Sequence, residues 1–393
     1  MARSVVILGG YGETGGRVAR LLARRTGVPL ALAGRDLAKV SSLAAEIGRT
    51  VPDAEVRGLA LDAADLAALG TACEGAALVV NALAGRLLPH HAIAEAAVRA
   101  GADVLDLQYP AWDTHDLDFL AKREGRCVVT QAGFHPGLPG VLARWAADRL
   151  DLLGTVWVAG LLRPRGGIPL TPAVDDLIES FRGYRTYALR DGRWERVGLL
   201  SPRAMPAAWF DFGFGRQRTA LMDLDEVLAL PERYPELERA GFSIAGFDPV
   251  TDWVVMAAIW AALPFFRGRP LTPLSRLLCW STRTFGHAPH GVILQLEASG
   301  EVDGRATRLR LGLFHEDGYD LTAIPAVAMA EQLLDGSARE PGAHLMGLLA
   351  DPERLLGDVR EMGVRVRGSV SQGPGVGPRP EPQGRAAPTK CSK

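Results

Sequence analysis

The sequence predicts an α/β protein, with a doubly wound parallel sheet followed by an inserted α+β domain. Three observations predict this fold. A glycine-rich turn near the N-terminus joins an apolar run to a helix, and short apolar runs then alternate with helical patterns through the first third of the chain. A long alternating hairpin, unsuited to a parallel nucleotide sheet, lies near residue 303. The 393 residues are enough for two domains.

The first apolar run, residues 5–8, leads into Gly-Gly-Tyr-Gly-Glu-Thr-Gly-Gly, and a helix is expected over residues 17–25. Gly10, Gly12 and Gly15 satisfy G-x-G-x-x-G, in which the glycines allow a tight turn, close approach of a pyrophosphate and close helix–strand packing. The helix N-terminus then favours phosphate. The alternative is a glycine-rich turn in another α/β protein. We predict cofactor contacts from Gly10, Tyr11, Gly12, Glu13, Thr14 and Gly15.

The second predicted strand, residues 29–33, ends in Gly34-Arg35-Asp36. NAD-preferring sites place an acidic residue here against the ribose 2′-hydroxyl, whereas a guanidinium suits a 2′-phosphate. Lys39 adds positive charge one turn later. Arg35 therefore favours NADP over NAD as the cofactor. Asp36 either caps the following helix or contacts a ribose.

Four further strands complete a Rossmann-type sheet of six. They are expected over residues 56–62, 76–82, 103–107 and 127–130, with helices over 88–99 and 117–123. Ligands of such sheets bind beyond the carboxyl ends of the strands. We therefore add Asp62, Asn81 and Ala82 to the predicted cofactor-binding residues.

The same edge of the sheet supplies three candidate catalytic residues: Asp106, Tyr109 and His135. Asp106 ends the fifth strand, and its carboxylate either holds a cationic iminium or bonds the next loop. Tyr109 either faces the substrate or lines a domain joint. His135 lies in Gly-Phe-His-Pro-Gly and either donates a proton near neutral pH or belongs to a hinge. Reduction of C=O needs such a donor, whereas a protonated iminium does not.

The pattern in the middle of the chain predicts a separate α+β unit. A strand is expected over residues 155–162, and a helix begins after Thr171 and ends at Gly183. The basic loop over 163–167 either holds a substrate carboxylate or merely precedes a structural helix. The segments 291–302 and 305–314 flank Asp303-Gly304, which predicts a type I′ hairpin. An exposed sheet edge here makes a homodimer plausible.

Four segments resemble the saccharopine dehydrogenase family of NAD(P)-dependent oxidoreductases: GGYGETGGRVARLLA, AGRDLAKVSSLA, NALAGRLLPHHAIAEAAVRAGADVLDL and GFHPGLPGVLARWAADRL. The resemblance implies a Rossmann domain, an inserted α+β domain for substrate binding and dimerisation, and C-terminal helices that return to the Rossmann domain. It also implies reduction of an imine or the reverse oxidation, although the family includes enoyl reductases. The expected boundaries are residues 1–135, 136–320 and 321–367, followed by a disordered tail over 368–393.

Composition excludes several other classes. The net charge of −1 argues against a basic nucleic-acid-binding surface, and four scattered cysteines suit a reducing cytoplasm. Residues 1–3 leave no room for a signal peptide before the first strand. The apolar segment 253–266 is too short to span a bilayer, so it is either a buried or interface helix or a membrane-surface contact. His287 and His290 have metal-like spacing without a third ligand, and we predict no metal site.

The sequence thus predicts a cytoplasmic NADP-dependent oxidoreductase that transfers a hydride to an imine or another polarised double bond of a small molecule. The aromatic residues between 194 and 266 indicate an apolar substrate pocket. The alternative is therefore an enoyl-type reductase with an apolar or lipid-like substrate. A third reading is a non-catalytic NADP-binding scaffold or a membrane-surface partner. The arginines that could bind substrate carboxylates are Arg163, Arg165, Arg182 and Arg185.

Overall fold

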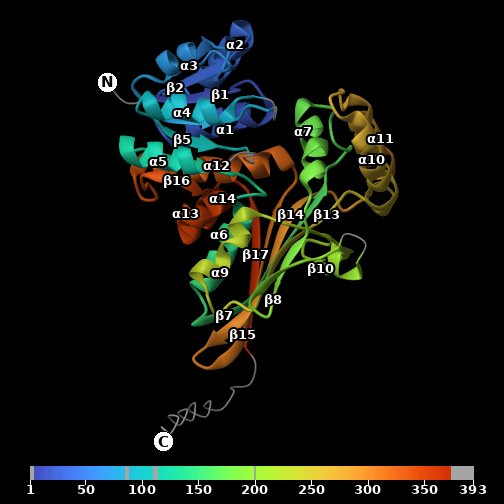
Figure 1. Ribbon diagram of the computed structural model, residues 1–393. Coiled ribbons are helices and arrows are strands. Elements are labelled where there is room, and N and C mark those ends of the chain that lie inside the picture. The colour runs from blue at the N-terminus through green and yellow to red at the C-terminus, as the bar shows by residue number, and fades with distance from the viewer. Residues whose placement is uncertain (1–3, 85–87, 109–113, 199–200, 373–393) are drawn as a thin grey trace, which may run out of the picture.

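The computed structural model describes residues 4–84, 88–108, 114–198 and 201–372. They form a parallel sheet with helices on both faces, a second mixed sheet, and a group of helices beside the second sheet (Figure 1). The two sheets confirm the predicted α/β fold with a second α+β unit.

The first sheet has seven parallel strands in the order β16-β6-β5-β4-β1-β2-β3. All six strands expected from the sequence are present, and their order is that of a doubly wound sheet. The seventh, β16, comes from the C-terminal part of the chain and pairs with β6. The bounds are β1 (Ser4–Leu8), β2 (Leu30–Gly34), β3 (Val56–Ala60), β4 (Ala76–Asn81), β5 (Asp103–Asp106), β6 (Cys127–Thr130) and β16 (Gly342–Leu345).

Both faces of this sheet are buried, as the nearly unbroken apolar strands require. Along β1, Val5 and Ile7 join one core cluster, whereas Val6 and Leu8 join another. The first cluster lies under α1 (Glu13–Arg25), α2 (Leu37–Thr50) and α12 (Gly318–Asp335). The second lies under α3 (Leu66–Cys73), α4 (His90–Arg99) and α5 (His115–Glu124).

The second sheet has the order β17-β15-β14-β7-β13-β8-β9, with β12 paired to β13. Val302 faces Arg305 across the predicted hairpin, and the positive φ values of Asp303 (50°) and Gly304 (66°) confirm the type I′ turn. The strands are β7 (Leu152–Arg163), β8 (Tyr187–Arg190), β9 (Arg193–Arg196), β12 (Ala220–Met222), β13 (Arg239–Ala245), β14 (Gly291–Val302), β15 (Arg305–His315) and β17 (Arg365–Gln372).

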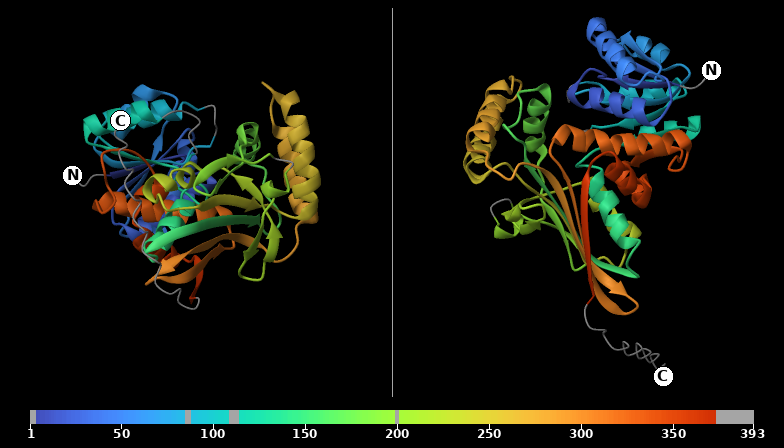
Figure 2. Two further views of the ribbon diagram at one scale, coloured as in Figure 1. Left: turned by 60° about the horizontal axis from the view of Figure 1, so that its bottom comes forward. Right: turned by 180° about the vertical axis from the view of Figure 1, so that it is seen from behind.

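The last strand corrects the predicted start of the tail. The sequence placed it at Gly368, but β17 continues to Gln372 and pairs with β15 along its length (Figure 2). The edge of β15 supplies the ladder hydrogen bonds that this polar segment cannot provide for itself. The polar composition of residues 368–372 does not show this partner, so the sequence predicted a disordered tail there. The C-terminal part of the chain therefore contributes one strand to each sheet.

A helical lobe, defined here as residues 172–183 and 251–285, lies beside the second sheet (Figure 2). It has its own small core, which includes Ile178, Ile259 and Leu278. No helix in the described ranges is long and apolar enough to cross a membrane. The lobe consists of α7 (Pro172–Ser180), η1 (Phe181–Gly183), η3 (Thr251–Val255), α10 (Met256–Ala262), η4 (Leu263–Phe266) and α11 (Thr272–Phe285).

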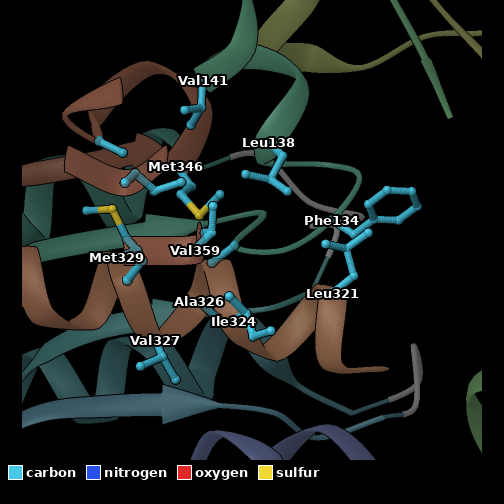
Figure 3. Packing of buried hydrophobic residues seen from close by; sticks show 14 of the residues in the cluster. Phe134, Leu138, Val141, Leu321, Ile324, Ala326, Val327, Met329, Met346 and Val359 are labelled. Carbon is cyan, nitrogen blue, oxygen red and sulfur yellow. The ribbon is translucent and has the colours of Figure 1, made fainter. Parts of the chain in front are cut away.

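The two sheets share one continuous core at their junction. Figure 3 shows Leu138 and Val141 of α6 (Leu138–Ala147) near Met346, with Ile324 and Met329 of α12 below them. The same cluster reaches Leu294 and other residues of the second sheet, so the halves are not separate hydrophobic units. The remaining elements are α8 (Asp225–Leu228), α9 (Leu230–Arg233), α13 (Met346–Leu349), α14 (Pro352–Glu361), η2 (Pro202–Ala204), β10 (Ala207–Phe210) and β11 (Gly215–Arg218).

Candidate active site

The glycine-rich turn has the geometry of a phosphate cradle. Gly9 adopts φ 72°, and the Gly12 N–H donates to the Gly9 carbonyl at 2.8 Å. A Cβ on Gly15 would lie well inside van der Waals contact with the Gly9 carbonyl oxygen, so only glycine fits there. The first helical bond runs from the Gly16 N–H to the Gly12 carbonyl at 2.9 Å. The N–H groups of Glu13, Thr14 and Gly15 therefore precede the helical ladder and are available to an anion.

The end of β2 carries the residues predicted to distinguish NADP from NAD. Asp36 caps α2 by accepting the Lys39 N–H at 3.2 Å, which supports the capping interpretation. Arg35 is exposed and makes no ion pair within the described part of the chain. Tyr11 lies over Gly34, where a Cβ would come within 2.5 Å of its ring, and the Lys39 ammonium lies 5.5 Å from the ring centroid. Arg35 and Lys39 therefore place two positive charges beyond the cradle, and this pair is called the basic edge below.

The two other predicted cofactor contacts from strand ends lie on the same side of the sheet. Asp62 follows β3 and is exposed, and its carboxylate accepts the Ala64 N–H at 3.1 Å. Ala82 follows β4, and its carbonyl approaches Gly9, where a Cβ would come within 2.9 Å. The turn is therefore held against β4 by backbone contact.

Asp106 and Asn81 form a buried polar network instead of lining an open site. The Asn81 amide donates to the Asp106 carboxylate at 3.0 Å and lies 3.0 Å from the His90 Nδ1. The Gln108 N–H donates to the other Asp106 oxygen at 2.8 Å. Burial raises the pKa of Asp106 to about 6, although the Gln108 N–H and His90 oppose the rise. Tyr109, the neighbouring candidate, lies outside the described residues.

A cavity of about 910 Å³ separates the parallel sheet from the second sheet and the helical lobe. Glu13, at the start of α1, belongs to its lining, so the phosphate cradle and the cavity are contiguous. Asp106 and Asn81 are not part of that lining. The polar side chains that reach the cavity from the described residues are Glu13, Arg17, His135, Arg165, His290, Glu316, Asp317, Tyr319, Thr322 and Arg365.

Several of these residues escaped the sequence analysis because they belong to distant segments. Arg17 of α1 pairs with Glu13 at 2.7 Å, Asp320 at 2.9 Å and Asp317 at 3.3 Å. Its guanidinium carbon also lies 5.2 Å from the centre of the Tyr319 ring. Arg17 thus joins the start of α1 to the start of α12 at the mouth of the cradle. Two local signals were visible: the i,i+4 spacing of Glu13 and Arg17, and the helix-capping pattern of Asp317.

Of the predicted catalytic residues that the structure describes, Asp106 and His135, only His135 lines the cavity. Its ring packs edge-on against Phe134, with the centroids 4.5 Å apart, and lies 5.8 Å from Phe242. Its buried Nδ1 has no hydrogen-bond partner among the described residues. Burial lowers the pKa of His135 to about 4. This direction disfavours an imidazolium near neutral pH, so the proton-donor role of His135 stays a prediction.

The four arginines considered for substrate carboxylates have different surroundings. Arg163 is buried and donates to the Phe247 carbonyl at 2.9 Å. Arg182 bonds Glu179 and the Leu263 carbonyl, and Arg185 lies 3.7 Å from Asp223. Of these four residues, Arg165 alone belongs to the cavity lining. The helix after the basic loop is tied down by a hydrogen bond from Ser275 to Asp175.

Comparison with known proteins agrees with this geometry. Residues 5–128 match the family described as the saccharopine dehydrogenase NADP binding domain. Apo saccharopine dehydrogenase (L-Glu forming) from Saccharomyces cerevisiae is similar in structure, with a TM-score of 0.68 and 16% identity over 94% of this chain and 100% of that chain. No curated protein matches the sequence significantly.

Two other solved structures are more distant. Diaminopimelate (DAP) dehydrogenase from C. glutamicum, in complex with DAP, has a TM-score of 0.46 and 14% identity over 92% of this chain and 99% of that chain. GenD2 from gentamicin A biosynthesis, in complex with NAD, has a TM-score of 0.44 and 16% identity over 92% of each chain.

The parallel sheet, its glycine cradle and the matching cofactor-binding family define an NAD(P)-dependent oxidoreductase. Within that class, residues 5–128 match a saccharopine dehydrogenase NADP binding domain, and the fold of the chain is similar to that of saccharopine dehydrogenase.

Proposed function

We propose that the protein uses NADP to transfer a hydride to the carbon of an imine held in the interdomain cavity of about 910 Å³. The observation that carries the proposal is that Glu13 belongs both to the phosphate cradle and to the cavity lining. A dinucleotide bound by the cradle would supply the hydride beside the cavity. The missing Cβ at Gly15 leaves the room that this backbone approach needs.

The choice of NADP rests on the basic edge beyond β2. Arg35 is exposed and Lys39 lies over Tyr11, so two cations are available to a 2′-phosphate. Asp36 does not compete for the ribose because its carboxylate caps α2. We assign the 2′-phosphate contact to Arg35.

We assign the cationic iminium to Glu316 of the cavity lining, because the other two carboxylates there, Glu13 and Asp317, already pair with Arg17. Hydride addition to a protonated iminium makes the C–H bond and converts the C=N double bond to an amine, so no proton donor is needed in that step. His135 is neutral at physiological pH, and its ring orients the substrate by packing and by one hydrogen bond rather than by donating an imidazolium proton.

An enoyl-type reductase remains the second candidate because the cavity lining continues into an apolar chamber behind His135. Hydride addition to an enoyl group would leave an enolate that has to be protonated, and the His135 imidazole is the ionisable ring that reaches this part of the cavity. A non-catalytic scaffold is the third reading. It would bind NADPH without oxidising it.

The test is NADPH oxidation, followed by absorbance, with cyclic imines and with ketones and trans-2-enals of the same carbon skeleton. We expect oxidation with the imines and little with the ketones. Oxidation with the enals alone would replace the proposal by the second candidate. Tight NADPH binding without oxidation by any of the three series would support the scaffold. Absence of NADPH binding would overturn all three readings.

A further inference from the structure

A second cavity, of about 520 Å³, lies behind His135 between the second sheet and the helical lobe. Its walls come from β12 and β13 on one side and from α7, η1 and α10 on the other. His135, Leu162 and Leu177 line both cavities, so the second is a side chamber of the proposed substrate site. A substrate whose reacting bond lies near His135 can extend into it.

The chamber is built for apolar contact. Phe181, Tyr184 and Trp260 form an aromatic cluster with ring centroids 5.4–6.2 Å apart. Three methionines, whose flexible side chains adapt to a ligand's shape, complete much of the wall: Met205, Met222 and Met256.

The polar groups of the wall are largely engaged by the protein. The Tyr184 hydroxyl donates to the Leu221 carbonyl at 2.6 Å, and the Thr219 hydroxyl donates to the Pro206 carbonyl at 2.8 Å. One Asp252 oxygen accepts the Phe247 N–H at 2.9 Å. Apart from His135, Trp260 and Arg218, the wall offers a polar ligand few partners to replace its hydration, whereas a hydrocarbon chain has none to lose.

From this lining we propose that the substrate carries an unbranched aliphatic chain, which occupies the side chamber while its polarised double bond lies beside His135. The proposal names the substrate class of the proposed function and rests on it. The methionine-rich wall favours a flexible chain over a rigid planar group. Trp260, whose buried Nε1 has no partner among the described residues, offers a hydrogen bond to one polar atom on that chain.

The test measures binding of 1-alkanols from butanol to dodecanol to the full chain by calorimetry, without cofactor or turnover. We expect affinity to rise about fourfold per methylene, the equivalent of ~0.8 kcal/mol, until the chamber is filled. Ala257→Trp should weaken decanol binding at least tenfold and leave butanol nearly unchanged. Ala258→Trp is the matched control, because Ala258 is the next residue on α10 and does not line the chamber.

Affinity that does not depend on chain length, or equal effects of the two tryptophan variants, would overturn the proposal. Met205→Trp, which fills the chamber from a different wall, replaces Ala257→Trp if that variant does not fold. A parallel NADPH titration distinguishes failure of the proposed function from failure of the aliphatic-substrate proposal. Alkanol binding without NADPH binding would remove the proposed function and leave the apolar chamber, whereas the reverse would remove only the aliphatic substrate.

An independent observation concerns the outer surface of the helical lobe. Val254 (63% exposed), Phe265 (75%) and Trp280 (54%) are exposed on this lobe, and Trp253 (39%) is partly exposed although it also lines the second cavity. Residues 250–290 also hold four arginines and a single acidic residue, although the whole chain has a net charge of −1. Arg276, Trp280 and Arg283 share one face of α11 by their spacing, and all three are exposed.

We infer that this surface binds an anionic lipid bilayer. Exposed tryptophan and phenylalanine bury their rings at the headgroup level, and neighbouring arginines are attracted to anionic lipids. A second copy of the chain is a poorer occupant, because a symmetric contact would bring the arginines of both copies together.

The test is co-sedimentation of the full chain with vesicles of phosphatidylcholine alone or mixed with phosphatidylglycerol. We expect binding to the anionic vesicles only, weakened by salt. The double variant Val254→Glu, Trp280→Glu should lose binding at least tenfold, whereas Trp209→Glu, an equally exposed tryptophan on β10, should not. No binding to anionic vesicles, or equal losses in both variants, would overturn the inference. A dimer that the double variant converts to a monomer would assign the surface to a second copy instead.

Discussion

The two halves of the molecule build their ligand sites by different means. In the parallel-sheet half, backbone forms the cradle: a Cβ would clash with backbone at Gly9 and Gly15 and would be crowded at Gly12. In the second half, side chains line the cavities, from His135 to the aromatic cluster of the helical lobe. A site made of backbone recognises the diphosphate of a dinucleotide, because peptide N–H groups bind every diphosphate in the same way. A side-chain site can change its ligand by substitution, so the second half determines specificity.

The largest expected effect is a loss of NADPH affinity when the backbone cradle is changed. Gly15→Val would place side-chain atoms against the Gly9 carbonyl and should reduce NADPH affinity by more than 100-fold, measured by cofactor fluorescence. Gly48→Ala is the control, because Gly48 lies in α2 with open space around it. That change should stabilise the protein by ~0.5–1 kcal/mol and leave NADPH binding intact. A Gly15→Val protein that binds NADPH normally would remove the distinction between the halves.

The second effect concerns His135, at the junction of the two cavities. His135→Phe should lower kcat about 100-fold if the imidazole contacts the reacting group, and His135→Gln, which keeps an N–H donor, should lose less. Because burial lowers the pKa of His135 to about 4, its protonation should affect kcat/KM only below about pH 5. A rate profile with a limb between pH 6 and 7 that disappears in His135→Gln would contradict the neutral ring.

A smaller effect is expected from the basic edge of the cofactor site. Arg35→Ala should weaken NADPH binding by ~1.5–3 kcal/mol through loss of a charge-assisted hydrogen bond, and should leave NADH binding almost unchanged. Arg57→Ala, on the neighbouring strand β3, is the control for loss of a positive charge in this half. Equal losses for NADPH and NADH would remove the case for NADP.

The joint between the halves contains a buried carboxyl group whose ionisation opposes folding. Glu226 of α8 accepts the Gly137 N–H at 2.8 Å, and burial raises the pKa of Glu226 to about 8. The folded state therefore binds the proton more tightly than the unfolded state. This group stabilises the protein fully below about pH 4.5, and that contribution is lost as the pH rises to 8, by at most ~1.4 kcal/mol per pH unit.

Glu226→Gln keeps an acceptor for the Gly137 N–H and cannot ionise, so the free energy of unfolding should depend less on pH between 5 and 8. Urea unfolding at several pH values measures it. Glu232→Gln, an exposed change on the adjacent α9, is the control. Identical pH dependence in the wild type and Glu226→Gln would show that the carboxyl does not stay buried at the joint.

The smallest effect is expected at the C-terminus. A chain that ends at Gln372 keeps the whole of β17 and should unfold at the same temperature as the full chain, measured by circular dichroism. A chain that ends at Gly368, where the sequence placed the end of ordered structure, loses half of the β15 pairing and should melt a few degrees lower. Equal melting temperatures would show that β17 contributes nothing after Gly368.

Local sequence was sufficient for much of the cofactor half. The strands up to Thr130, the Asp36 cap and the type I′ turn at Asp303 each depend on neighbouring residues, whereas α1 begins at Glu13 and not at Arg17 as predicted. The sequence did not reveal β16, the length of β17 or the Arg17 cluster, because each depends on a partner far along the chain. Asp106 was correctly placed at a strand end, but its burial against Asn81 and His90 depends on packing between β4, β5 and α4.

By itself, the sequence determined the first six strands of the parallel sheet and its glycine cradle, since backbone conformation and helix capping are set within a few residues. Tertiary structure alone decided which side chains meet in the two cavities. It brought Arg17 to Asp317, placed His135 where the two cavities meet, and lowered the pKa of that histidine. Those properties follow from burial and from contacts between segments as many as 300 residues apart, which no local pattern encodes.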